Sequence, residues 1–182
     1  SAEDTLEITV DRSGSVTPEG MVGFWKGEDN ARDSLTLNNG ELLNGTIFTA
    51  GIVGRAFQFD GVNDDLVIPA ASETNAGVAS EFSFECWVNP SILSGLRPIA
   101  EWGTSGTSSQ IYGSAGASGN FSANLVDLNG GSHTLRAPAG TLIQGQWQHV
   151  AVTYSKANGV MRLYRNGAVV AQGVIGSFSF RS

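Results

Sequence analysis

The chain has 182 residues, of which 41% are hydrophobic and 15% are charged, and this composition is enough for one packed domain but too apolar for wholesale disorder. Its 10 basic and 17 acidic residues give a formal net charge of −7, and the scattered Lys and Arg make nucleic acid a poor partner. The 24 glycines favour a turn-rich all-β chain, and no apolar run approaches the roughly 20 residues that span a bilayer.

The first 19 residues differ from the rest. LEITV alternates like a strand, and DRSGSVTPEG has the Gly and Pro of a linker. We therefore expect residues 1–19 to be the end of a preceding module plus a linker, and residues 20–182 to form the main domain. The chain carries no signal peptide and does not begin with Met, so we expect it to be part of a longer protein.

From Met21 onward, short runs rich in Val, Ile, Phe, Trp and Tyr are separated by Gly, Asn, Pro or Ser, and no longer window keeps a helical period. Many short strands at this spacing predict an all-β jelly-roll sandwich of two antiparallel sheets. The predicted strands are VGFW, AFQFDG, DDLVIP, FSFECWVNP, PIAEWG, QIYG, FSANLVDL, SHTLRAP, WQHVAVTY, MRLYRNG and AVVAQG.

Residues 147–172 carry the strongest structural signal. Asn158-Gly159 and Asn166-Gly167 each stand between two strand-like runs, and Asn-Gly suits a type I′ turn, so we predict three consecutive antiparallel strands. In FSFECWVN the alternation predicts one inward and one outward set. The inward set is Phe82, Phe84, Cys86 and Val88, and the outward set is Ser83, Glu85, Trp87 and Asn89. Cys86, the sole cysteine, is expected to be a small buried hydrophobe.

Catalysis finds little support in the sequence. Glycoside hydrolysis needs two carboxylates across the scissile bond, and the nearest candidates are Glu81 and Glu85 on one side of a predicted strand. His149 has no acidic neighbour in sequence, and the chain has no G-x-S-x-G elbow, so a strand histidine bonded to a backbone group is the better interpretation. We expect no catalytic residues.

The turn FDGVNDDLVIP concentrates Asp60, Asn63, Asp64 and Asp65, and oxygen ligands of this kind are those that calcium takes. The alternative is that Asp and Asn favour turns for their own backbone hydrogen bonds. A second polar stretch, GEDNARD, could supply distant ligands or only loop polarity; it contains Glu28, Asp29, Asn30 and Asp33. We predict Asp60, Asn63 and Asp64 as the metal ligands, with Ca2+ as the cofactor.

A binding surface is the third hypothesis. Trp87 shares a face with Glu85 and Asn89, while Trp102 and Tyr112 stand near predicted loops, as does Trp25. An aromatic ring stacks on the C–H face of a sugar while neighbouring polar groups take its hydroxyls, although aromatic residues also serve as core or rim packing. The candidate ligand-binding residues are Trp87, Glu85, Trp102 and Tyr112.

Five motifs occur in the order of a known family: FWKGEDNARD, GRAFQFDGVNDDLVIP, FSFECWVNP, GQWQHVAVTY and MRLYRNGAVV. Over residues 21–173 they resemble the laminin G-like jelly-roll domain of the concanavalin A-like lectin/glucanase superfamily. The resemblance implies that Trp147-x-His149 and Leu163-Tyr164-x-Asn166-Gly167 lie on central strands, so that His149 is structural. It also implies a module of secreted or cell-surface proteins that binds carbohydrate or protein, often with calcium. Likeness to the related pentraxins places Asn63 and Asp64 at part of a calcium site.

The resemblance also implies strands after the RNGAVV hairpin, ending in a Gly-x-Ile-Asp-Glu segment, whereas this chain ends at GVIGSFSFRS. We therefore expect the sandwich to be truncated at its C-terminus, with an unpaired strand edge, an uncovered apolar face and a tendency to self-associate. The function we expect is non-catalytic carbohydrate binding in an extracellular multidomain protein. The alternatives are a protein-adhesion or spacer module and, less favoured, a glucanase-like hydrolase.

Overall fold

The computed structural model describes residues 18–72, 74–103, 108–116 and 119–182. The LEITV strand expected for a preceding module, and most of the expected linker, lie outside the described residues. Within the described part, the chain is built from strands and a single short 3-10 helix, η1 (Ala76–Val78). No helix among these residues has the length and the apolar character that crossing a membrane requires.

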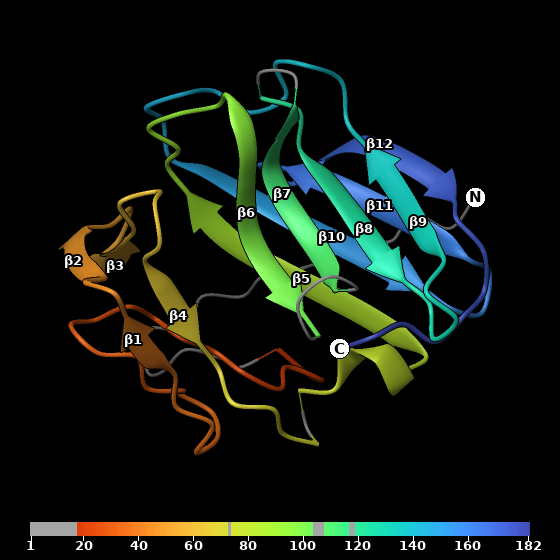
Figure 1. The fold of residues 1–182 in the computed structure, drawn as a ribbon, viewed down its shortest axis with the longest axis horizontal. Helices are drawn as coiled ribbons and strands as arrows, with labels where there is room; N and C mark the ends of the chain where they lie inside the picture. The colour runs from red at the N-terminus through yellow and green to blue at the C-terminus, as the bar shows by residue number, and fades with distance from the viewer. Residues whose placement is uncertain (1–17, 73, 104–107, 117–118) are drawn as a thin grey trace.

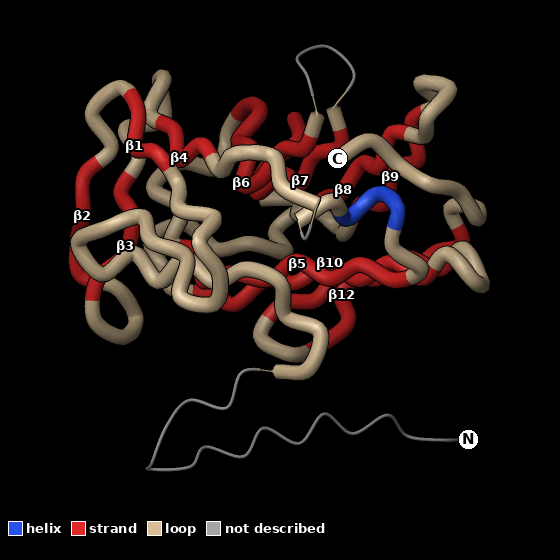
Figure 2. The backbone as a smooth tube through the Cα atoms, turned by 90° about the horizontal axis from the view of Figure 1, so that it is seen from below, coloured by secondary structure: helices blue, strands red, loops and turns tan. Residues whose placement is uncertain are grey.

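Two four-stranded antiparallel sheets stack face to face, as Figures 1 and 2 show. The first sheet has the order β12-β11-β10-β5, with bounds Ala168–Val174, Val160–Arg165, Gln148–Ser155 and Glu81–Val88. The second sheet has the order β6-β7-β8-β9, with bounds Gly95–Trp102, Ser109–Gly116, Ser122–Val126 and Ser132–Arg136. The predicted antiparallel sandwich is confirmed.

The core lies between these sheets because alternate residues of each strand point inward. The predicted alternation in β5 is confirmed, with Phe82 buried and Phe84, Cys86 and Val88 packed against the core. The fully buried apolar side chains of the first sheet are Val150, Val152, Met161 and Leu163, and those of the second are Ile111, Ala123 and Leu125. Because the inward positions are mostly apolar, the outward positions of each sheet are free to carry other chemistry.

Two small sheets lie at one end of the sandwich (Figures 1 and 2). β1 (Glu41–Leu43) pairs with β4 (Asp65–Val67), and β2 (Ile47–Ala50) pairs with β3 (Arg55–Gln58). The sequence did not predict β1 or β2. Among the described strands, β5 and β6 are sheet edges.

The strand predicted at VGFW is wrong. Trp25 forms only an isolated bridge with Asp33. Hydrogen bonds that involve side chains hold this segment instead of strand pairing. The Phe24 N–H donates to an Asp33 carboxylate oxygen at 2.9 Å, and the Trp25 indole donates to the Asn38 carbonyl at 3.0 Å. A polar loop that supplies these acceptors leaves the backbone without a strand partner.

The three strands predicted over residues 147–172 are confirmed, but only one of the two turns is type I′. Asn166 and Gly167 both have positive φ, at 49° and 79°, as that turn requires. Asn158 does not have positive φ, whereas Gly159 does, and four residues separate the paired Ser155 and Val160. A longer loop needs a left-handed residue only at its end, so here glycine alone takes that conformation.

The last residues of the chain close one end of the sandwich. Phe180 is 3% exposed and packs edge-on against Phe82, with ring centroids 5.4 Å apart. The Ser182 hydroxyl accepts a hydrogen bond from the Gly77 N–H at 2.9 Å, and the Ser109 hydroxyl donates to the Arg181 carbonyl at 2.9 Å. A Cβ on Gly77 would lie only 1.8 Å from the Phe180 carbonyl oxygen, so only glycine fits at this contact.

Candidate ligand-binding face

The outer face of the second sheet carries two rows of side chains that face away from the core. Strand pairing aligns Tyr112 of β7 with Ser122 of β8, and Ser122 with Arg136 of β9. Two residues further along each strand, the same pairing aligns a second row, composed of Gln110, Asn124 and Thr134. The row between them points inward and consists of Ile111, Ala123 and Leu135. Period-two alternation therefore builds a polar face directly over an apolar core.

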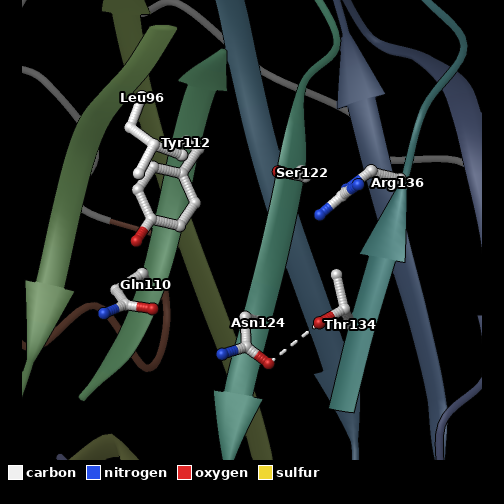
Figure 3. A pocket seen from close by; sticks show the side chains of 7 residues that line it. All are labelled: Leu96, Gln110, Tyr112, Ser122, Asn124, Thr134 and Arg136. Atoms are coloured by element: carbon white, nitrogen blue, oxygen red, sulfur yellow. Dashed lines mark hydrogen bonds between the residues drawn. The ribbon is translucent and has the colours of Figure 1, made fainter. Parts of the chain in front are cut away.

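A hollow of about 290 Å³ lies over these two rows, and Leu96 of β6 completes its lining (Figure 3). The small Ser122 forms its floor, with Tyr112 on one side and Arg136 on the other. Neighbouring strands are about 4.8 Å apart, so about 10 Å of backbone separates Tyr112 from Arg136. The hollow is near the lower end of small-molecule site volumes, which suits one small ligand or the end of a chain.

The second row offers hydrogen-bonding groups in a fixed arrangement. The Thr134 hydroxyl donates to the Asn124 carboxamide oxygen at 3.0 Å, which leaves the Asn124 NH₂ group directed to other acceptors (Figure 3). The Gln110 NH₂ group donates to the Ser108 hydroxyl at 2.9 Å, and this hydroxyl in turn donates to the Glu101 carboxylate. The row therefore offers both donors and acceptors, and a sugar hydroxyl can bond to either kind of group.

Charges on this face are separated. Glu101 of β6 pairs in register with Gln110 and so lies at the end of the second row, whereas Arg136 ends the first row on the opposite edge strand. Burial raises the pKa of the Tyr112 phenol, and the negative charge of Glu101 raises this pKa further. Tyr112 therefore presents a neutral ring and hydroxyl to the hollow at ordinary pH.

The structure places Trp87 and Glu85 on the outer face of the other sheet. Trp87 is 49% exposed and contacts the His149 ring edge-on, with centroids 5.4 Å apart. The His149 Nε2 lies 3.6 Å from a Glu85 carboxylate oxygen, and the His149 N–H donates to the Asn166 side chain at 2.9 Å. The ring was expected to bond a backbone group; instead its partner is an acid on the paired strand, which sequence order hides.

Trp102 is not on either outer face. Its ring packs edge-on against Phe82 and Phe84, with centroids 5.3 and 5.5 Å away, and it belongs to the core packing. The four predicted ligand-binding residues therefore do not form one site. Tyr112 lines the hollow, Trp87 and Glu85 lie across the sandwich, and Trp102 fills the space between the sheets.

The acids weighed for catalysis are also away from the hollow. Glu81 and Glu85 occupy outward positions of β5, and none of the described residues that line the hollow is Asp or Glu. Cys86 offers no nucleophile, because burial, with a smaller contribution from Glu85, raises the pKa of its thiol to about 12. The predicted buried role of Cys86 is consistent with this environment.

The predicted calcium turn uses its acids for its own backbone. One Asp60 carboxylate oxygen accepts from the Val62 and Asn63 N–H groups at 2.8 and 3.3 Å, and the Asp64 carboxylate accepts from the Asp60 N–H at 2.9 Å. The pKa of Asp60 is lowered, first by the Val62 hydrogen bond. Throughout the described part of the chain, no group of three or more His, Cys, Asp or Glu comes together as metal ligands. As arranged here, the Asp60 and Asp64 carboxylates are engaged with backbone amides of the turn.

The second polar stretch is likewise occupied within its loop. Asp29 forms an ion pair with the Arg55 guanidinium at 3.1 Å, and the Glu28 carboxylate accepts from the Arg55 N–H at 3.2 Å. Burial would raise the pKa of Asp33, but hydrogen bonds from Thr36 and from the Phe24 and Leu35 amides outweigh it and lower that pKa. Glu28 and Asp29 therefore hold β3 against this polar stretch, whereas Asp33 bonds residues 24–36 to one another.

Sequence reasoning missed most of the hollow. QIYG, FSANLVDL and SHTLR were predicted as strands, and their alternation already separates outward Gln110, Asn124, Thr134 and Arg136 from inward apolar residues. The sequence does not give the pairing register that sets these residues beside one another. Of the residues that line the hollow, only Tyr112 was predicted to bind a ligand.

The fold and the motifs can now be compared with known proteins. A laminin G family model, described as the concanavalin A-like lectin/glucanases superfamily, matches residues 60–180, which is more than half of the chain. The chain belongs to this superfamily. This match confirms the resemblance stated from the sequence motifs. The two-sheet jelly-roll sandwich of the structure agrees with it.

Two solved structures are similar to this superfamily member. Domain 4 of AbnA, a GH43 extracellular arabinanase from Geobacillus stearothermophilus solved in complex with arabinotriose, has a TM-score of 0.59 at 19% identity; the match covers 84% of this chain and 74% of that one. The CBM40 of the Ruminococcus gnavus IT-sialidase, bound to alpha2,3 sialyllactose, has a TM-score of 0.41 at 20% identity, covering 57% of this chain and 58% of that one. No curated protein matches the chain.

Proposed function

We propose that the chain is a non-catalytic carbohydrate-binding module whose ligand occupies the hollow on the second sheet. The observation that carries the proposal is the composition of that hollow: one aromatic ring, two carboxamides, hydroxyl groups and a guanidinium, set in two aligned rows over a rigid sheet. A sugar ring has an apolar C–H face and a rim of hydroxyls, and this set matches both surfaces.

Each row would take a different part of the sugar. The Tyr112 ring supplies a face for C–H packing, while Asn124 and Thr134 supply an amide donor and a hydroxyl beside it. Because these side chains project from paired strands rather than loops, they need little ordering when the ligand arrives, and less affinity is lost.

The absence of acidic residues from the described lining supports binding without hydrolysis. Retaining and inverting glycosidases place two carboxyl groups on either side of the scissile bond, about 5 to 10 Å apart. Here Glu101 is the nearest acid by register, and its carboxylate already accepts the Ser108 hydroxyl hydrogen bond. A single acid beside the hollow does not make that pair.

The arabinanase domain, which has the same fold and was solved with arabinotriose, adds support because it shows that such a sandwich can serve as a sugar-binding domain of a larger enzyme. We infer the same context for this chain: a domain of a secreted multidomain protein that holds the protein on a glycan. No membrane insertion is needed for this role.

The test is a glycan array followed by calorimetry on the hits. Tyr112→Ala should weaken glycan binding at least about tenfold, since aromatic anchors dominate small interfaces. Trp87→Ala is the matched control, because it removes a half-exposed aromatic ring from the other sheet. If Trp87→Ala abolishes binding and Tyr112→Ala does not, the hollow is not the site.

A protein-contact module is the second candidate, and the exposed Trp87 favours it. A half-exposed Trp flanked by His149 and Glu85 has the composition of an interface anchor. If the array yields no ligand and a protein partner is lost on Trp87→Ala, adhesion through the first sheet replaces sugar binding.

Calcium at Asp60, Asn63 and Asp64 stays a separate prediction. Binding would require the two carboxylates to exchange their backbone amides for the ion. A ligand at a hundredfold excess over its Kd stabilises the fold by about 2.7 kcal/mol, so the melting temperature should rise in millimolar calcium and rise less in magnesium. Asp64→Ala should remove that rise. An unchanged melting temperature would show that these acids serve only the turn.

A further inference from the structure

Among the described residues that line the hollow, Arg136 is the charged one, and no acidic side chain pairs with it. It ends β9, an edge strand of the second sheet, with an exposed side chain that points over the hollow (Figure 3). Within the described part of the chain, no ion pair or side-chain hydrogen bond reaches its guanidinium. This is notable in a chain of net charge −7, where acids outnumber Lys and Arg.

Three other described arginines are engaged, although the Arg165 Nε also lacks a partner. Arg55 pairs with Asp29, Arg97 donates to the Gly61 carbonyl at 3.3 Å, and Arg162 donates to the Gln172 side chain. An unengaged guanidinium in a hollow keeps its fork of N–H donors available for a planar acceptor. A carboxylate matches that fork with two parallel hydrogen bonds, which a hydroxyl cannot do.

The layout of the face fixes the orientation of such an anion. Glu101 lies at the opposite corner, one row and three strands from Arg136, and its charge disfavours a carboxylate at the β6 side. Between the two, the hollow lies over Ser122, whose short side chain takes up little of the space between Tyr112 and Arg136. A sugar carrying a carboxylate would therefore lie with its acid toward β9 and its ring toward Tyr112.

We propose that the hollow selects a sugar that carries a carboxylate, such as a uronic acid unit, and that Arg136 binds this group while Tyr112 packs on the ring. This proposal rests on the proposed carbohydrate function and names the class of sugar. One cation suits one negative charge. A heavily sulfated chain would need a cluster of basic residues, and Arg136 is the only Lys or Arg among the described residues that line the hollow.

The experiment compares oligosaccharides that differ only in the charge of one kind of group. The probes are trigalacturonate and its methyl ester, and xylotetraose that carries either a glucuronic acid branch or the corresponding neutral glucose branch. Calorimetry on the whole chain should give a Kd at least about tenfold lower for the acidic member of a pair, since a hydrogen bond to a charged group is among the stronger kinds. Added salt should reduce that difference.

Variants then assign the preference to Arg136. On Arg136→Gln, the acidic probe should bind no more tightly than its neutral partner does on the same variant. Arg136→Lys should retain part of the preference, because charge remains but the fork is lost. The control is Arg162→Gln, which removes an equal charge from the outer face of the other sheet and should leave both affinities unchanged.

The outcomes separate the two proposals. If neutral and acidic probes bind equally, and Tyr112→Ala weakens both, the selection for acids is overturned while sugar binding stands. If neither these probes nor a broad glycan array binds the chain, the proposed function fails and the inference fails with it. A preference that survives Arg136→Gln would also overturn the role of this arginine.

Discussion

The two outer faces of the sandwich come from the same alternation but differ in how their side chains are used. On the first sheet, His149 of β10 contacts both Glu85 and Trp87 of β5, and Arg162 bonds Gln172 across β11 and β12. On the second sheet, Tyr112 and Arg136 stand on either side of Ser122 over a hollow. The first face pairs these groups across its strands, whereas the second face holds Tyr112 and Arg136 apart, even though Thr134 and Asn124 in its other row are paired.

The difference comes from one position in the ladder. Two large residues that lie two strands apart are too distant to pair with each other, and a small residue on the strand between them does not fill the gap. Ser122 has this role between Tyr112 and Arg136. Outward side chains that cannot contact one another remain available to a third molecule.

Filling the hollow is expected to have the largest effect. Ser122→Phe puts a ring where the ligand would lie and should reduce glycan binding by about 100-fold or more, comparable with loss of a binding hot spot. Ser83→Phe is the matched control, since Ser83 occupies an outward position of β5 on the other face. Melting curves of both variants should stay cooperative; if Ser122→Phe stays folded and binds normally, the hollow does not hold the ligand.

Removing one amide from the second row should have a smaller effect. Asn124→Ala deletes the partner of the Thr134 hydroxyl and one donor to the ligand, and we expect glycan affinity to fall about two- to tenfold. Gln172→Ala makes the corresponding change on the first sheet, where it leaves Arg162 without its partner. Calorimetry with one glycan on both variants distinguishes the faces, and equal losses would mean that the second row has no special role.

The first sheet should respond in stability rather than in binding. His149→Gln removes the ring that contacts Trp87 and Glu85, and we expect the free energy of unfolding to fall by under about 1 kcal/mol, because the pair is partly exposed. Urea titrations measure this change. A lost hydrolytic activity in this variant, with the circular dichroism spectrum intact, would show that the histidine is catalytic after all.

Acid pH should destabilise the second sheet near Asp127, which follows β8. This limits the pH range in which binding to the two faces can be compared. The His133 ring bonds Asp127 at 2.9 Å and lowers its pKa, with further lowering by the Gly131 and Asn129 amides. A carboxylate whose folded pKa lies below its unfolded value of about 3.9 stabilises the fold fully above that value. This contribution is lost as the pH falls through the lower folded pKa.

Asp127→Asn should therefore flatten the acid limb of a stability-against-pH curve below about pH 4, with little change in slope at neutral pH. Thermal melts between pH 2 and 7 measure it. An unaltered acid limb would remove Asp127 from the set of groups that set acid stability. Binding to the two faces is best compared above this range, where the second sheet is intact.

Sequence patterns predicted the strands better than the site. In β5, β10 and β11 the outward and inward sets follow from period two alone, and Asn166-Gly167 fixes one turn because both residues must accept positive φ. The hollow could not be predicted in the same way. Tyr112, Ser122 and Arg136 are neighbours only through pairing register. Asn129-Gly130 indicates a hairpin between β8 and β9, but it does not set the register of β7 against β8.

The same limit explains the errors at Trp102 and His149. Both residues belong to aromatic or polar types that serve equally well in a core and at a surface, so composition could not place them. The partners that decide the matter are Phe82 and Phe84 for Trp102, and Glu85 for His149, all of them on another strand. Prediction of such partners requires the sheet order, which a single sequence does not contain.

The closing contacts of the C-terminal segment have a consequence for how the chain folds. Ser182 bonds Asn75 and Gly77, which precede it by 107 and 105 residues, and Phe180 enters the core beside Phe82. Contacts between such distant residues slow folding because a long loop must close before they form. The sandwich cannot complete its core on the ribosome until the segment around Phe180 has left the exit tunnel. Until then the apolar rim around Phe82 stays uncovered, and this nascent state is the one most exposed to aggregation.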